Sequence, residues 1–135
     1  MEIVEIEKLK NKLLNQLSGG QVQRAYLAMS IAQNPKILLL DEPTTFLDIN
    51  YQIKFLESLR QLIKNNGISI ITVLHDINLA ARFCDRIAIL KNGKLIDINT
   101  PQKVFTEFNF KKAFDIDSYI VNTPVGFQMF PVSKK

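Results

Sequence analysis

The sequence predicts an α/β fold in which helices and strands alternate along one domain. Two short, continuously apolar runs, residues 37–40 and 68–74, are typical of parallel strands that are buried on both faces. Residues 49–65 between them carry apolar side chains at helical spacing, as expected of the helix that joins two parallel strands. A shorter helix at about 77–83 and then two more strands are expected, so the sheet begins parallel and finishes antiparallel.

Length and composition restrict the possible classes of protein. The chain has 135 residues, 47% of them hydrophobic, which is enough for one core and too apolar for a disordered segment. Its 17 basic and 13 acidic residues give a net charge of +4, and the basic residues are scattered, so no nucleic-acid partner is predicted. No apolar run approaches the roughly 18 residues that cross a bilayer, and the acidic start is unlike a signal peptide. The single cysteine, Cys84, is expected in the core, and these features fit a cytoplasmic protein.

The first third of the chain predicts two helices around a glycine-containing segment. Residues 1–14 show helical periodicity without a start signal, since Met1 lies inside the pattern, which suggests that the chain has lost what came before. LeuSerGlyGlyGln follows at 17–21. The next helix is expected over about 22–33, because the AsnPro pair at 34–35 cannot continue it.

The last third of the chain predicts short elements joined by turns. A strand is expected at 86–91, and the AsnGly pair at 92–93 that follows it favours a tight hairpin, because both turn residues need positive φ. The tail, residues 100–135, is expected to form one or two short helices and then strands around 119–121 and 127–132.

Polar side chains follow both buried strands at the point where each strand ends. Asp41 and Glu42 come directly after the first strand, and His75 follows the second. Because parallel strands place their carboxyl ends at one edge of a sheet, we expect these groups to lie together. An AspGlu pair in this place suits phosphoryl transfer, with the first carboxylate on Mg²⁺ and the second orienting a water molecule. A structural interpretation stays open, with the acidic pair capping the loop and His75 a satisfied strand-end histidine.

The segment 17–21 also has two interpretations. Ser18 and Gln21 have the spacing of a capping box, and Leu17 and Val22 can form a hydrophobic staple at the start of a helix. The same geometry can bind an anion, because two glycines let it approach the backbone and the helix N-terminus offers free N–H groups.

The motifs taken together resemble a known family. Four motifs occur in order: LeuSerGlyGlyGln at 17–21, IleLeuLeuLeuAspGluPro at 37–43, ThrThrPheLeuAsp at 44–48 and LeuHisAsp at 74–76. This order resembles the C-terminal half of an ATP-binding cassette (ABC) ATPase over nearly the whole chain. The segments 74–86 and 100–105 are most similar to the importer ATPases for iron-siderophore, haem or vitamin B12 uptake.

The resemblance implies a role for each motif. Residues 17–21 look like the signature motif, which contacts the γ-phosphate of ATP held by a partner subunit; it comprises Leu17, Ser18, Gly19, Gly20 and Gln21. Asp41 resembles the Walker B magnesium ligand and Glu42 the catalytic carboxylate. Asp48 closes what looks like the D-loop, and His75 resembles the switch histidine that contacts the γ-phosphate. ATP and Mg²⁺ are therefore the implied cofactors, and a second ATPase subunit and membrane permease subunits are the implied partners.

One departure from the family pattern affects the expected activity. No GxxxxGK[ST] motif occurs in the sequence, although this loop and its lysine provide most of the phosphate cradle. Phe46 stands at a D-loop position where many members have a small residue. We therefore expect a partial P-loop NTPase (RecA-like) core of mostly parallel strands, in a single incomplete domain that divides at 1–34, 35–99 and 100–135. Strand 37–40 should then expose an apolar face.

Three functional hypotheses follow from these motifs. The chain is part of an importer ATPase that acts at a dimer interface on the inner face of the cell membrane, and alone it neither binds nor hydrolyses ATP. Alternatively, it is a non-catalytic module that docks on a complete cassette subunit, or an inactive gene remnant. ABC-type ATPases that act on DNA share the signature motif, but the absence of a basic stripe argues against them.

Overall fold

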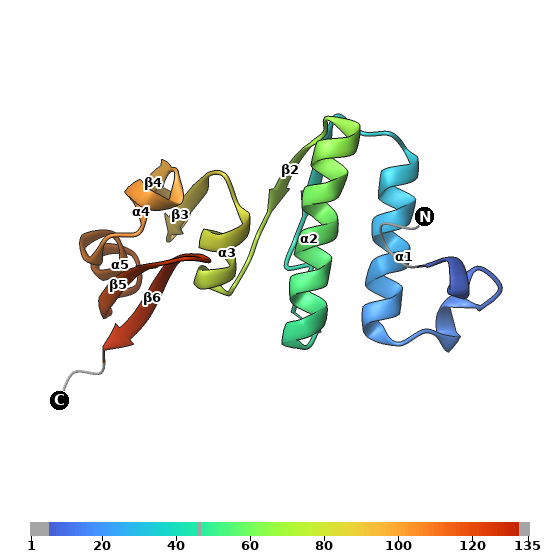
Figure 1. The fold of residues 1–135 in the computed structure, drawn as a ribbon, viewed down its shortest axis with the longest axis horizontal. Helices are drawn as coiled ribbons and strands as arrows, with labels where there is room; N and C mark the ends of the chain where they lie inside the picture. Colours follow the sequence, from blue (N-terminus) through green and yellow to red (C-terminus); the bar gives the residue numbers. More distant parts are fainter. Residues whose placement is uncertain (1–5, 46, 133–135) are drawn as a thin grey trace. The chain divides into compact units, whose positions relative to one another are not determined.

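The computed structural model describes residues 6–45 and 47–132, which divide between His75 and Asp76 into two compact units (Figure 1). Each unit is built from short elements that are close in sequence. The expected division of a single domain at 34 and 99 stays a prediction. Among the described residues, no helix is long and apolar enough to cross a membrane.

The first unit contains two helices and one pair of parallel strands. Its elements are the 3₁₀ turns η2 (Glu7–Leu9) and η3 (Leu14–Gln16), α1 (Gly19–Ala32), β1 (Ile37–Leu40), α2 (Ile49–Asn66) and β2 (Ser69–Thr72). The predicted strand at 37–40 and the helix after it are confirmed. The strand expected at 68–74 is confirmed in its central four residues.

The long N-terminal helix was wrongly predicted within the described part of 1–14. Residues 1–5 lie outside the described residues, and the remainder holds the single turn η2 before η3 begins. Leu13 and Leu14 are 66% and 51% exposed. A short amphipathic helix depends on burial of its apolar face, and these leucines find no such surface, so the periodic pattern alone does not form the helix.

Helix α2 has clear start and stop signals. Asp48 caps its first turn, and Gly67 ends it in the left-handed conformation with φ 64°. The buried side chains lie at helical spacing: Phe55, Leu56, Leu59 and Leu62. The helical spacing of apolar residues expected within 49–65 is therefore used for burial, but Ile49 at the start of the helix is exposed.

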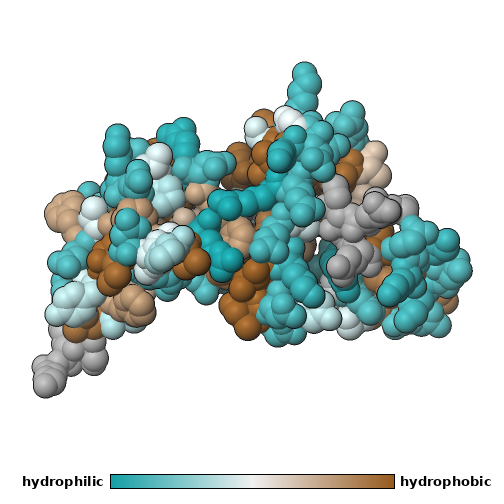
Figure 2. Space-filling view, viewed as in Figure 1, coloured by the Kyte–Doolittle hydropathy of each residue, from teal (hydrophilic) through white to brown (hydrophobic). Residues whose placement is uncertain are grey.

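Strands β1 and β2 pair in parallel, as predicted, with Leu39 beside Ile71. One face carries the buried Leu38, but Leu39 and Ile71 on the other face are 71% and 61% exposed. The predicted burial on both faces is therefore wrong for this pair. The exposed apolar face expected for strand 37–40 is confirmed. Figure 2 shows hydrophobic patches between hydrophilic residues on one face of the molecule.

The second unit contains three short helices and two hairpins. Its elements are α3 (Ile77–Phe83), β3 (Ile87–Lys91), β4 (Lys94–Asn99), α4 (Pro101–Val104), α5 (Glu107–Phe114), β5 (Asp117–Thr123) and β6 (Gly126–Val132). The predicted hairpin is confirmed, because Asn92 and Gly93 take φ values of 50° and 72°. The tail forms the two short helices and two strands that its sequence predicts.

The strands of the described residues form three separate pairs instead of one continuous sheet. Parallel pairing, expected for most of the strands, is found for β1 with β2, whereas β3 with β4 and β5 with β6 are antiparallel. The short turns explain this difference. A strand that follows a tight turn closes onto its neighbour at a small entropic cost, so local pairing forms first.

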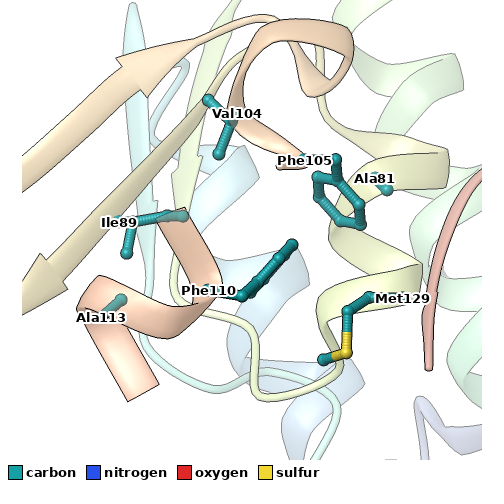
Figure 3. Close-up of a cluster of buried hydrophobic side chains, with 7 residues drawn as sticks. All are labelled: Ala81, Ile89, Val104, Phe105, Phe110, Ala113 and Met129. Atoms are coloured by element: carbon teal, nitrogen blue, oxygen red, sulfur yellow. The ribbon is translucent and has the colours of Figure 1, made fainter. Parts of the chain in front are cut away.

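The core of the second unit is a cluster of seven buried side chains (Figure 3). They are Ala81, Ile89, Val104, Phe105, Phe110, Ala113 and Met129. Phe110 is 1% exposed, and its ring meets that of Phe105 edge to face at 5.1 Å between centroids. Asn78 on α3 fixes β6 by donating to the carbonyl of Met129 and accepting from its N–H. Cys84, expected in the core, is only partly buried.

Candidate functional site

The carboxyl ends of β1 and β2 bring the predicted acid and histidine together. β1 ends at Leu40, so Asp41 and Glu42 begin the loop at this edge, and His75 follows β2 at the same edge. Nε2 of His75 lies 2.7 Å from Oε1 of Glu42. The side chains are 71% and 42% exposed, so the pair faces solvent and is open to a ligand. The predicted co-location is confirmed.

Glu42 has an unusual backbone conformation. Its φ is 47°, in the left-handed region, although it precedes Pro43, a position where sterics favour extended backbone. A non-glycine residue held there costs about 1–2 kcal/mol. Such strain persists when the surrounding contacts hold it, and it concentrates at functional sites.

Loop 41–48 is held by one of its own side chains and by one from the helix that follows it. The N–H and the Oγ1 of Thr45 donate to the Glu42 carbonyl and to Glu42 Oε2, at 3.3 and 3.2 Å. Nε2 of Gln52, on the first turn of α2, donates to the carbonyls of Thr44 and Leu47 at 3.1 and 3.0 Å. The loop is therefore fixed to the helix that follows it.

The segment 17–21 forms the predicted capping box. Ser18 is the N-cap of α1, its Oγ accepts from the N–H of Gln21, and Gln21 Oε1 accepts from the N–H of Ser18. A side chain at Gly19 would meet nothing within 4 Å, so open space lies beside this glycine. At Gly20 an added Cβ would lie 2.8 Å from Leu47 Cδ2, so this glycine lets α1 approach loop 41–48.

Of the remaining predicted residues, Asp48 and Leu17 have local structural roles. Asp48 is the N-cap of α2 and accepts from the N–H of Tyr51 at 3.1 Å. Leu17 is half-buried and ends the η3 turn just before the capping box. Asp41 is exposed at the end of β1. Phe46 lies outside the described residues.

Comparison with known proteins assigns the chain to a family. The family described as "ABC transporter" matches residues 1–45. The petrobactin import ATP-binding protein FpuC of Bacillus anthracis is 44% identical over 117 residues, which cover 87% of this chain and 43% of that protein. The chain belongs to the ABC transporter ATP-binding family and matches part of its length.

Two further comparisons agree with this assignment. The iron(3+)-hydroxamate import ATP-binding protein FhuC of Bacillus subtilis is 46% identical over 108 residues, covering 80% of this chain and 40% of that protein. A solved dimeric structure of a bacterial ABC transporter cassette has a TM-score of 0.65 and 38% identity, over 74% of this chain and 44% of that chain. The chain thus spans less than half the length of these relatives.

The residues at the strand edge fit a magnesium nucleotide that brings its own oxygen ligands. Within residues 6–45 and 47–132, no group of three or more His, Cys, Asp or Glu side chains could hold a metal ion. Mg²⁺ usually keeps several waters and binds one or two carboxylates together with substrate phosphates. The exposed Asp41 beside Glu42 is a carboxylate that fits this kind of site.

Sequence reasoning missed two residues of this site. Thr45 and Gln52 hold loop 41–48, and neither was singled out from the sequence. A signal existed for Thr45, because a threonine three residues after an acidic residue can close a turn onto it. Gln52 gave no signal, because its two acceptors are backbone carbonyls whose positions depend on the folded loop.

Proposed function

We propose that the chain is the half of an importer ATPase that carries the catalytic carboxylate and the signature segment. The Glu42–His75 contact at 2.7 Å carries this proposal, because it joins an acid and a histidine where two parallel strands end. The substrate class is an iron chelate, in line with the names of the relatives FpuC and FhuC; haem and cobalamin are the alternatives.

The proposed mechanism gives each side chain one task. Asp41 would hold Mg²⁺, which when bound would supply positive charge to the phosphates of ATP. Glu42 orients and polarises the water that attacks the γ-phosphate, and it accepts the proton of that water. His75, which meets Glu42 at the same edge, would contact the γ-phosphate.

The signature segment 17–21 would act on a different nucleotide, the one bound by a second subunit. Its N–H groups lie at the start of α1, a helix of 14 residues, where the helix dipole favours an anion. The open space beside Gly19 leaves room for a phosphate to approach. Asp48, the N-cap of α2, would carry contacts across the two subunits.

The proposed activity requires a P-loop that this sequence does not contain. The chain would therefore bind ATP only together with a P-loop-bearing N-terminal half. The complete unit would dimerise, as in the solved dimeric cassette. It would act on permease subunits at the inner face of the cell membrane.

The test is to join the chain to a P-loop-bearing N-terminal half from a complete cassette of this branch. We call this protein the joined cassette. We expect phosphate release from ATP that depends on Mg²⁺ in the joined cassette, and none from the 135-residue chain alone. Turnover by the chain alone, or an inactive joined cassette that still binds ATP and dimerises, would contradict the proposal.

A further inference from the structure

Thr45 donates two hydrogen bonds to Glu42. Its backbone N–H donates to the Glu42 carbonyl at 3.3 Å, and its Oγ1 donates to Glu42 Oε2 at 3.2 Å. The first bond closes the four-residue turn from Glu42 to Thr45. The second bond ties the carboxylate itself to this turn.

The two oxygens of the Glu42 carboxylate therefore face different partners. Oε2 accepts from Thr45, and Oε1 lies 2.7 Å from Nε2 of His75. A carboxylate held at one oxygen cannot rotate its other oxygen freely. The Thr45 hydroxyl thus fixes the plane in which Oε1 meets His75.

The conformation of Glu42 makes this support necessary. Its φ of 47° and the following Pro43 place it in a strained turn, and its side chain is 42% exposed, so packing alone does not hold it. An exposed glutamate has several accessible rotamers, and only a few of them point Oε1 at the strand edge.

We propose that Thr45 is a positioning residue, which acts through Glu42 and holds its carboxylate in the orientation that catalysis needs. This inference rests on the proposed function, because the value of that orientation lies in ATP hydrolysis. Thr45 itself touches no reacting atom. Serine keeps the hydroxyl and should replace it, whereas valine has the same shape and removes the donor.

The first test uses the 135-residue chain alone, without nucleotide. His75 is the only histidine, so its ring gives one set of signals in ¹H–¹⁵N spectra. We expect Thr45→Val to speed the exchange of the His75 Nε2 proton with water about fivefold, because the carboxylate leaves the ring for part of the time. Thr45→Ser should retain the exchange rate of the unsubstituted chain. The control Thr100→Val changes an exposed threonine of the second unit whose side chain makes no capping bond.

The second test uses the kinetics of the joined cassette. We expect Thr45→Val to lower kcat about tenfold with an unchanged KM for ATP, since a misplaced catalytic group slows the reaction without weakening binding. Thr45→Ser should restore kcat. When Glu42 is already glutamine, Thr45→Val should cause no further loss, because Thr45 acts through the Glu42 carboxylate.

The two tests separate this inference from the proposed function. An inactive joined cassette would overturn the proposed function. The exchange rate of the His75 Nε2 proton would still show whether Thr45 orients Glu42. Unchanged exchange in Thr45→Val, equal defects in the serine and valine variants, or a full further loss beside Glu42→Gln would each overturn the positioning role.

Discussion

Replacing Glu42 by glutamine in the joined cassette is expected to lower ATP turnover by at least about 100-fold. Glutamine keeps the size of the side chain and an oxygen that can face His75, but it loses the negative charge that polarises water. ATP binding should be retained, because the phosphates are held by the P-loop and Mg²⁺. Steady-state phosphate release and a separate nucleotide-binding titration measure these two effects.

The matched control for this substitution is Glu57→Gln. Glu57 lies on the exposed side of α2, in the same unit as Glu42. Because both substitutions replace glutamate by glutamine, they change the charge of the protein equally. It should leave turnover within about twofold, as for ordinary surface substitutions. If the joined cassette turned over ATP equally well with Glu42→Gln, Glu42 would not be the base and the proposed mechanism would be wrong.

Replacing Phe110 by alanine is expected to destabilise the second unit by about 3–5 kcal/mol. The ring is 1% exposed and meets Phe105 edge to face at 5.1 Å and Phe114 in a stacked arrangement at 6.0 Å. Its removal leaves a cavity among side chains from three helices and both hairpins. Hydrogen exchange resolved by residue would show this loss, because it reports each unit separately.

The control for the core is Phe108→Ala on the same helix. Phe108 is 72% exposed, and its ring lies 5.9 Å from Nζ of Lys112. Its removal should cost less than about 1 kcal/mol. Similar losses of protection in the two variants would show that the cluster around Phe110 does not carry the stability of this unit.

Much of the fold could be predicted because its signals are local. The Asn92–Gly93 turn, the Ser18 cap and the αL glycine that ends α2 each depend on a few neighbouring residues. The helix expected within 1–14 failed because its apolar face finds no packing surface among the described residues, so Leu13 and Leu14 stay exposed. The burial of both faces of strand 37–40 failed for the same reason, since Leu39 has no covering element among the described residues.

The candidate site was predictable to the extent that topology determines it. Parallel strands joined by a helix bring Glu42 and His75 to one edge, and the sequence contains both strands and the helix between them. The orientation of the carboxylate was not predictable. It depends on the positive φ of Glu42 and the Thr45 hydroxyl, which are visible only in the folded loop.

The most direct test of the central claim asks whether Glu42 and the signature segment serve different nucleotides of one dimer. Joined cassettes with Gly19→Asp, which puts a negative charge into the open space at the helix start, and with Glu42→Gln should each be inactive. Mixing them produces heterodimers in which one site has an intact Glu42 and an intact signature segment. We predict that the mixture recovers about a quarter of the unmodified activity, as random pairing in a two-fold dimer gives. A mixture as inactive as its two components would contradict the account.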